Sequence, residues 1–165
     1  MHRLGLELDV ARQLLRERSA GVFIWEFFSG EMHLTRSTTY GGHHCGVPCG
    51  LRAGVDLTRK PVHNAMLTRV RYFKPWLCTM AFPCSPLSPL QTLFGFQNNE
   101  PIEDTRDRHE EQSLTFVAKL MRLQAYEGRL GLAENPLSSA AWRTDTMASL
   151  INEGLHELVH GDQCA

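Results

Sequence analysis

Short apolar runs and longer amphipathic stretches alternate along this chain. Nearly continuous apolar runs are typical of strands buried in a parallel sheet. Such runs cover residues 22–28, 76–82 and 130–133, with weaker extended pieces at 45–47 and 55–58 and a last strand at 156–160. Segments with helical spacing of apolar residues separate them, at 31–40, 61–72, 103–127 and 140–152. The alternation predicts an α/β fold with a doubly wound, mostly parallel sheet flanked by helices.

The pattern divides the chain into two parts. Residues 1–20 contain an amphipathic helix at 3–18, which we expect on the outside of the domain. Residues 21–165 carry the strands and helices of one α/β domain, a size at which a substantial core can be buried. No apolar run approaches the roughly 20 residues of a membrane-spanning helix, so we expect no membrane partner.

The charge balance argues against a protein that holds nucleic acid through an overall basic surface. Lys and Arg number 17 against 18 Asp and Glu, a formal net charge of -1, whereas such proteins usually carry a basic excess. A local basic face remains open, because Arg69, Arg71 and Lys74 stand beside Tyr72 and Phe73 and could contact a phosphate backbone. The simpler interpretation is a solvated helix end.

The five cysteines indicate a reducing compartment. Their number is odd, one lies inside a predicted buried strand, and we find no secretory signal, which together favour an intracellular protein. The run His43–Cys45 and Cys49 could be read as zinc ligands, but a structural zinc usually draws on two separated pairs. We favour a turn with incidental histidines there, and surface positions for His156 and His160.

Cys84 is the first candidate for chemistry. It follows Pro83 at the end of the apolar run 76–82, and three prolines within residues 83–89 turn the backbone out of the sheet. A thiol in this position lies at the carboxyl edge of a parallel sheet, where open α/β folds bind their ligands. The alternative is a small buried core thiol, a common role for a free cysteine.

Two further turns are expected at the same edge. Phe28-Ser29-Gly30 follows the first strand, and Glu134-Asn135-Pro136 follows the strand at 130–133. A thiol nucleophile needs a group that makes its target electrophilic, and a carboxyl that can share a proton is one such partner. A glutamate at the end of a buried strand is partly shielded from water, which favours its protonated form. The alternative is that Glu134 caps a helix that begins near Ser138.

The order of these segments resembles the amino-terminal half of the catalytic domain of the DNA (cytosine-5) methyltransferases. The resemblance rests on Phe27-Phe28-Ser29-Gly30, Val55-Asp56-Leu57-Thr58, Phe82-Pro83-Cys84-Ser85-Pro86-Leu87-Ser88 and Glu134-Asn135-Pro136. The segments 26–30, 74–76 and 162–164 are also similar to methyltransferase-like segments of eukaryotic retroelement-type polyproteins. Over about residues 21–165, the resemblance implies a Rossmann-like, S-adenosyl-L-methionine-dependent methyltransferase fold in a nuclear protein.

The resemblance implies catalytic roles for three residues. Cys84 would add to C6 of a cytosine flipped out of the DNA duplex, because a stacked base cannot be reached. Glu134 would hold N3 and lend it a proton, so that C5 attacks the methyl group of S-adenosyl-L-methionine. Asn135 would help to hold the loop.

The resemblance also implies a cofactor site. Phe28 would lie near the adenosyl group, and Asp56 and Leu57 match an element that meets the adenine. Ser85 and Ser88 would belong to the loop that carries the nucleophile. The cofactor-binding residues implied are Phe28, Ser29, Gly30, Asp56, Leu57, Phe82 and Pro83.

The chain departs from the family pattern at several points. Glu31–His33 stand where the family's first turn is richer in glycine, and no acid for the ribose hydroxyls is present near Cys49-Gly50. Pro136 replaces the usual valine. The Gln-x-Arg-x-Arg element and the target-recognition domain find no counterpart before Ala165, so we expect a truncated domain that a further polypeptide could complete.

Three functions therefore stay open. The first is a DNA cytosine-5 methyltransferase-like enzyme. The second is a catalytically inactive methyltransferase-fold remnant that binds the cofactor or a partner chain. The third is an unrelated doubly wound protein with a structural thiol at Cys84.

Overall fold

The computed structural model describes residues 21–84, 108 and 110–161 of the 165-residue chain. The amphipathic helix predicted at 3–18, the loop residues Ser85 and Ser88, and the segment 162–164 lie outside the described residues. Most of the helix predicted at 103–127 is described, from residue 110 onward.

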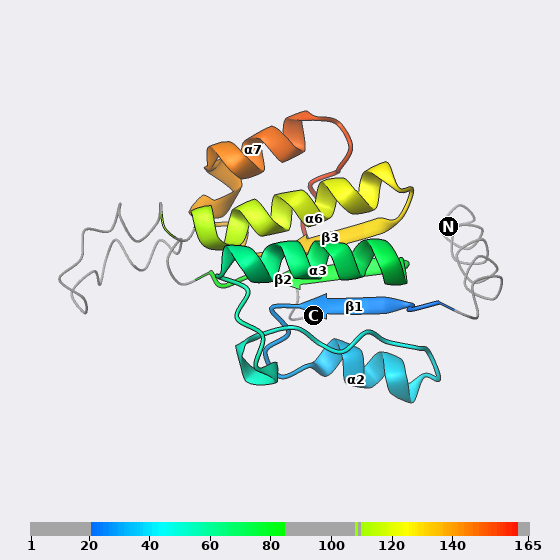
Figure 1. Ribbon diagram of the computed structural model, residues 1–165. Coiled ribbons are helices and arrows are strands. Elements are labelled where there is room, and N and C mark those ends of the chain that lie inside the picture. Colours follow the sequence, from blue (N-terminus) through cyan, green and yellow to red (C-terminus); the bar gives the residue numbers. More distant parts are fainter. Residues whose placement is uncertain (1–20, 85–107, 109, 162–165) are drawn as a thin grey trace, which may run out of the picture.

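A three-stranded parallel sheet forms the centre of the molecule (Figure 1). Its strands, in spatial order, are β1 (Ile24–Phe27), β2 (Leu77–Ala81) and β3 (Leu130–Glu134). Two isolated parallel bridges, Ile24 with Cys45 and Phe27 with Cys49, bring the segment 45–49 to the other side of β1. The predicted weak strand at 45–47 therefore lies beside β1, held by two bridges rather than by a regular ladder.

Helices and short helical turns lie between the strands and, for η4 and α7, after the last one, and the helices run antiparallel to the strands (Figure 1). They are α2 (His33–Tyr40), the 3₁₀ turn η1 (Leu51–Ala53), α3 (Lys60–Phe73), the π-helical turn η3 (Glu110–Leu114), α6 (Thr115–Tyr126), the 3₁₀ turn η4 (Ala140–Arg143) and α7 (Asp145–Asn152). Pro61 stands in the first turn of α3, where its missing N–H costs no helical hydrogen bond. Gly128, with φ 67°, follows the end of α6 in the left-handed conformation that glycine adopts without strain.

The two faces of β1 are covered by different helices. Trp25 and Phe27 join the core cluster that contains residues of α3 and α6. Glu26 points to the opposite face, where its Oε2 accepts hydrogen bonds from the backbone N and the Oγ1 of Thr35 in α2, at 2.9 and 2.6 Å. The α/β class and the parallel sheet predicted from the sequence are thus confirmed, in a small sheet whose architecture is compatible with a Rossmann-like fold.

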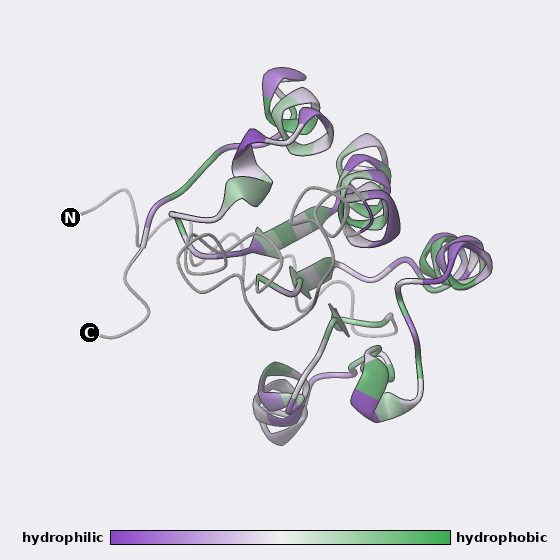
Figure 2. Cartoon of the chain, turned by 90° about the vertical axis from the view of Figure 1, so that its left-hand side faces the viewer, coloured by the Kyte–Doolittle hydropathy of each residue, from purple (hydrophilic) through white to green (hydrophobic). Residues whose placement is uncertain are grey.

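The core lies between the sheet and the helices α3 and α6, which are side by side on one face (Figures 1 and 2). Figure 2 shows apolar strands between helices of mixed hydropathy. Fully buried side chains fill the space between these layers, among them Phe27, Val70, Met80, Phe116 and Leu120. The aromatic rings of Phe27 and Phe116 lie 5.6 Å apart in a tilted arrangement.

A buried side-chain amide joins α6 to the beginnings of two strands. Gln124 is fully buried, and its Nε2 donates to the carbonyls of Pro75 and Leu130, at 3.2 and 2.8 Å. Its Oε1 accepts from the Nε of Arg129 at 2.8 Å. Because a buried polar group without a partner is costly, the Gln124 amide determines how α6 sits on β2 and β3.

Three expectations from the sequence are wrong in the structure. Residues 156–160 form no strand; their apolar Leu158 and Val159 are exposed and pair with no ladder. Residues 55–58 are not extended, because Asp56 Oδ1 accepts from the backbone N and the Oγ1 of Thr58, which makes a turn. Helix 140–152 is broken at Thr144, whose extended backbone and side-chain oxygen cap a new helix at Met147 N.

The strand predicted as buried at 130–133 is covered on one face only. Gly131 faces α6, where a Cβ on it would come within 2.6 Å of the Met121 Sδ. Leu130 and Leu132, on either side of Gly131 in the strand, are about half exposed, at 50% and 55%. The apolar run at 130–133 therefore does not mark a strand buried on both faces. In the described sheet, β3 is an edge strand.

No helix in the described ranges combines the length and the apolar character that a membrane crossing requires.

Replacing Gln124 with alanine should destabilise the fold more than any surface change on the same helix. The substitution leaves two carbonyls and the Arg129 Nε without their partner in a buried place, at a cost of at least about 2 kcal/mol. Urea unfolding of Gln124→Ala measures the loss. The control is Lys119→Ala on the exposed side of α6, which should change stability by less than about 0.5 kcal/mol; equal effects of the two variants would contradict this role.

The contact between α6 and α7 should weaken in acid. Arg122 donates from Nε and Nη2 to the Glu153 carboxylate, at 2.5 to 3.0 Å, and this hydrogen bonding lowers the pKa of Glu153 below its ordinary value of 4.5. Its stabilising effect is therefore full above pH 4.5 and is lost as the pH falls through the lowered pKa of the folded state.

Unfolding of the unchanged protein and of Glu153→Gln at pH 7 and pH 3 tests this contribution. The variant should be less stable at pH 7, and the difference should shrink at pH 3. Glu157→Gln, an exposed position in the segment that follows α7, serves as the control and should show no such convergence.

Candidate functional site at the carboxyl edge of the sheet

The three strands end together, so the turns predicted as functional lie along one edge. In the parallel register, Phe27 pairs with Met80 and Met80 with Ala133, and Ala81 pairs with Glu134. The turn after β1 (28–30), the turn after β2 (82–84) and the turn after β3 (134–136) therefore leave the sheet side by side. This is the edge at which open α/β sheets bind ligands.

Asn135 joins two of these turns. It is buried, and its Nδ2 donates to the carbonyl oxygen of Phe82 at 2.8 Å, which links the end of β3 to the residue two before Cys84. The Asn135 Oδ1 is also buried and has no hydrogen-bond partner among the described residues. A buried acceptor of this kind calls for an explanation, and a ligand or an ordered water is the usual one.

The turn after β1 has an unusual backbone. Phe28, Gly30 and Met32 all have positive φ, at 55°, 47° and 59°. Left-handed backbone at non-glycine residues is uncommon and costs free energy, and such residues cluster at ligand sites. Met32 also immediately precedes α2, so the helix begins directly from this turn.

A close backbone approach holds the same turn in place. The Ser29 N–H donates to the Cys49 carbonyl at 3.1 Å. Gly50 lies so close that a Cβ on it would stand 3.0 Å from Ser29 N and 3.1 Å from Ser29 Oγ. Ser29 is itself buried, and its Oγ has no partner within the described part of the chain. Ser29 and Asn135 thus give this edge two buried oxygen atoms with unused hydrogen-bonding capacity.

Cys84 is exposed, whereas two other described cysteines are buried. Burial raises the pKa of Cys49 and, more strongly, that of Cys78, which keeps both thiols protonated. Cys49 Sγ also donates to the Val47 carbonyl at 3.3 Å. The alternative of a buried core thiol therefore applies to Cys49 and Cys78 and is wrong for Cys84.

The other predicted catalytic and cofactor residues occupy varied environments. Glu134 is half-buried at the end of β3, next to the buried Asn135. Phe28 is half-buried and packs on the core, with its ring 6.2 Å from that of Phe116 in an edge-on arrangement. Phe82 is buried and meets Trp142 edge-on at 6.0 Å, while Pro83 is exposed.

Asp56 and Leu57 are engaged within their own segment. The Thr58 hydroxyl and backbone N–H donate to Asp56, and they lower the pKa of its carboxyl. Leu57 is buried in the core, and its carbonyl oxygen lies 2.7 Å from His63 Nε2. Asp56 and Leu57 therefore belong to the turn that leads into α3.

The segment 45–50 itself carries no acid that could bind a ribose, and the carboxylate of Glu31 pairs with Arg52 just after this segment. Cys49 bridges to Phe27, so the segment 45–49 ends beside the end of β1, and Gly50 follows there. Among the described residues, no three His, Cys, Asp or Glu side chains are grouped so that they could hold a metal ion. His43 instead packs on Phe23, with the two rings 4.6 Å apart.

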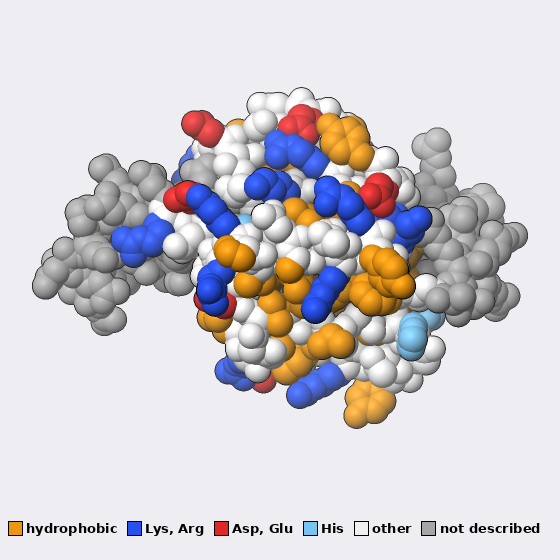
Figure 3. Space-filling view, viewed as in Figure 1, with side chains coloured by type: hydrophobic (Ala, Val, Ile, Leu, Met, Phe, Trp, Pro, Cys, Tyr) orange, Lys and Arg blue, Asp and Glu red, His pale blue; other side chains and the backbone are white. Residues whose placement is uncertain are grey.

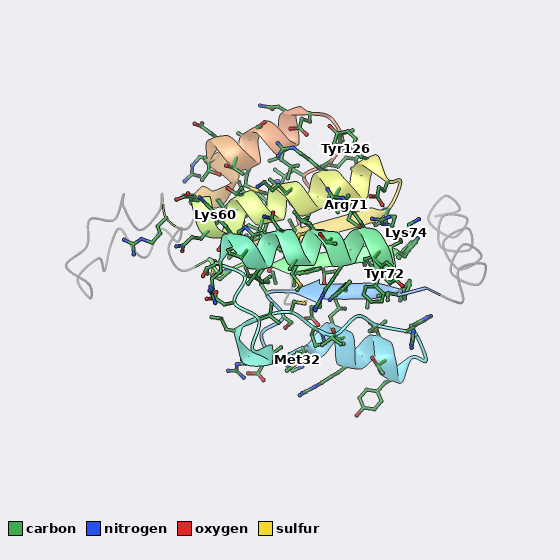
Figure 4. The ribbon with its side chains drawn as sticks, viewed as in Figure 1. Met32, Lys60, Arg71, Tyr72, Lys74 and Tyr126 are labelled. Carbon is green, nitrogen blue, oxygen red and sulfur yellow. The ribbon has the colours of Figure 1, made fainter. Side chains whose placement is uncertain are left out.

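The basic and aromatic residues after the middle of α3 lie at the other edge. Lys74 ends α3 just before β2 begins, so Arg71, Tyr72 and Lys74 lie at the amino ends of the strands, far along α3 from Lys60 (Figure 4). In Figure 3, Lys and Arg are scattered over the α3 and α6 face among acidic and apolar side chains. These cations therefore do not line the edge that holds Cys84.

Sequence reasoning missed two residues that shape this edge. Trp142 covers Phe82 and donates from Nε1 to the Pro136 carbonyl at 3.0 Å, which holds the turn after β3. Gly50 permits the close approach of the Ser29 turn. A glycine directly after a short extended segment is the one signal that could have marked Gly50; nothing in the sequence pattern marks Trp142.

No family model, curated protein or solved structure matches this chain.

Cys84 should be the fastest-reacting thiol of residues 21–161. In the native protein with Cys164 replaced by serine, a soluble disulfide reagent should modify Cys84 first and the half-buried Cys45 more slowly. Cys49 and Cys78 should react only on unfolding, because they are buried and protonated. Stopped-flow absorbance of the released thiolate measures the phases.

Adding Cys84→Ser to that background should remove the fast phase, and adding Cys45→Ser should leave it. A fast phase that survives the Cys84 substitution would show that the exposed position does not control reactivity.

Proposed function

We propose that this chain is an S-adenosyl-L-methionine-dependent, DNA cytosine-5 methyltransferase-like domain. The observation that carries the proposal is the Asn135 amide, which draws the turn of Cys84 and the turn of Glu134 together at the carboxyl edge of the sheet. An exposed thiol, a half-buried carboxyl and a left-handed first turn then share one edge.

The residues at this edge fit a nucleoside cofactor in part. The turn 28–30 offers a strained backbone, and Ser29 offers a buried hydroxyl without a partner among the described residues. S-adenosyl-L-methionine supplies an activated methyl group when bound. No ribose-binding acid stands at Gly50, so sugar contacts would have to come from other groups.

The proposed reaction uses two side chains of this chain. Cys84 Sγ would lose its proton to solvent and form a bond to C6 of an extruded cytosine, while the protonated Glu134 carboxyl would deliver its proton to N3. C5 would then take the methyl group, leaving S-adenosyl-L-homocysteine as the second product. A water molecule would remove the C5 proton as the C6–Sγ bond breaks and releases the Cys84 thiolate, and N3 would return its proton to Glu134. Asn135 holds the two turns in place and does not react.

The second candidate is a catalytically inactive domain of the same fold that binds the cofactor or a partner chain. Two observations favour it: Glu31 pairs with Arg52, and Met32 is half-buried, so bulky side chains follow Gly30. Duplex DNA is the partner that the enzyme implies, and a further polypeptide that completes the domain is a partner that either candidate could have.

Calorimetric titration with S-adenosyl-L-homocysteine tests cofactor binding. The enzyme requires such binding, and so does an inactive domain that retains the cofactor site. Gly50→Ala should weaken binding about tenfold or more, because the new methyl group pushes against the Ser29 turn. Ala65→Ser, on the exposed side of α3, should leave binding unchanged. Absence of any binding by the unchanged chain would overturn the methyltransferase proposal.

Trapping on a 5-fluorocytosine oligonucleotide with S-adenosyl-L-methionine separates the two candidates. A covalent adduct that Cys84→Ala abolishes and Cys45→Ala preserves supports the enzyme. Cofactor binding without an adduct supports the inactive domain.

A further inference from the structure

A cavity lies at the edge of the sheet opposite to the site described above. It has a volume of about 360 Å³, and its walls come from the last turns of α6, the start of β3 and the segment after α7. The lining residues are Met121, Ala125, Arg129, Leu130, Gly131, Leu155, His156 and Glu157. This size is at the lower end of the roughly 300–1,000 Å³ of small-molecule sites.

Arg129 brings a buried positive charge to this cavity. The residue is 6% exposed. Its Nε donates to Gln124 Oε1 at 2.8 Å, and its Nη1 pairs with Glu127. Its Nη2 is buried and has no hydrogen-bond partner among the described residues. A guanidinium with an unused buried donor is rare, since such a group normally finds an acceptor.

His156 supplies a second unused polar atom. Its ring is half-buried, and its Nε2 is buried with no partner in the described part of the chain. Burial, more than Glu153 and Arg122, determines the pKa of His156 and lowers it, so the ring is neutral at neutral pH. A neutral imidazole can then donate one hydrogen bond. The surface position expected for His156 therefore holds only for part of its ring, since the Nε2 side is buried.

The remaining walls are mostly apolar. Met121, Ala125, Leu130 and Leu155 line the cavity, and Leu130 and Leu155 are 50% and 42% exposed. Exposed apolar side chains that surround a few convergent polar groups are the usual make-up of a ligand site. The one lining carboxylate, Glu157, is exposed to solvent.

We propose that this cavity binds a small apolar carboxylate, with the anionic head at Arg129 and His156 and the apolar body against Met121, Ala125 and Leu155. A carboxylate oxygen can accept from Arg129 Nη2 and from His156, which satisfies both buried atoms. A cation would find no acceptor at Arg129 Nη2, which can only donate a hydrogen bond. A free phosphate would leave the apolar walls uncovered. The site is distinct from the one under the proposed function and does not depend on it.

The probe is octanoate, with octanol and inorganic phosphate as comparisons, titrated calorimetrically and by amide NMR on the full chain. Octanoate should bind with shifts at Gly131 and at residues 155–157, at least tenfold more tightly than octanol. Phosphate should show no comparable binding. Equal binding of octanol and octanoate, or binding of phosphate alone, would overturn the proposal.

Variants locate the site. His156→Ala should weaken octanoate binding several-fold, and Ala125→Leu, which fills the cavity, should abolish it. Arg129→Lys keeps the positive charge but loses the planar guanidinium, which can donate two hydrogen bonds to one carboxylate. A folded Arg129→Lys variant should therefore bind octanoate about tenfold or more weakly. His160→Ala, at an exposed position outside the cavity, is the matched control. Unchanged binding in folded His156→Ala and Ala125→Leu would overturn the assignment.

Discussion

Two buried side-chain amides hold the central strand to its neighbour at both ends. Gln124 donates to the carbonyls of Pro75 and Leu130 where β2 and β3 begin, and Asn135 donates to the Phe82 carbonyl just after β2 ends. The backbone ladder between β2 and β3 runs from Leu77 to Ala81 on the β2 side. The Gln124 and Asn135 side-chain amides bond to backbone carbonyls of Pro75 and Phe82, just beyond its two ends. Since an unpaired buried polar group is costly, both amides hold the strands in register rather than merely adding contacts.

The two amides also separate the molecule into two edges with different chemistry. At the carboxyl edge, Asn135 holds the turns that carry Cys84 and Glu134, beside the left-handed turn at Phe28. At the amino edge, Gln124 orients the buried Arg129 against a cavity. Both edges contain buried polar atoms without partners among the described residues. Two further buried hydroxyls, Thr79 Oγ1 in the middle of β2 and Ser113 Oγ in η3, also have no partner among the described residues.

The strands and helices were largely predictable because each is a local pattern. The apolar runs at 22–28 and 76–82 and the helical spacing at 61–72 report burial directly. The strand expected at 156–160 failed because an extended apolar segment becomes a strand only when a neighbour accepts its hydrogen bonds. The piece at 55–58 failed because the Asp56 side chain bonds to Thr58 and turns the backbone.

The sequence by itself determined the α/β class, the parallel strands and the turns that follow them, since periodicity and proline or glycine positions act over a few residues. Only the tertiary structure decided that Cys84 is exposed while Cys49 is buried, and that Asn135 reaches Phe82. It also decided that Arg129 and His156 line one cavity. Exposure and contacts between residues distant in the chain depend on how the layers pack, and no local pattern records that packing.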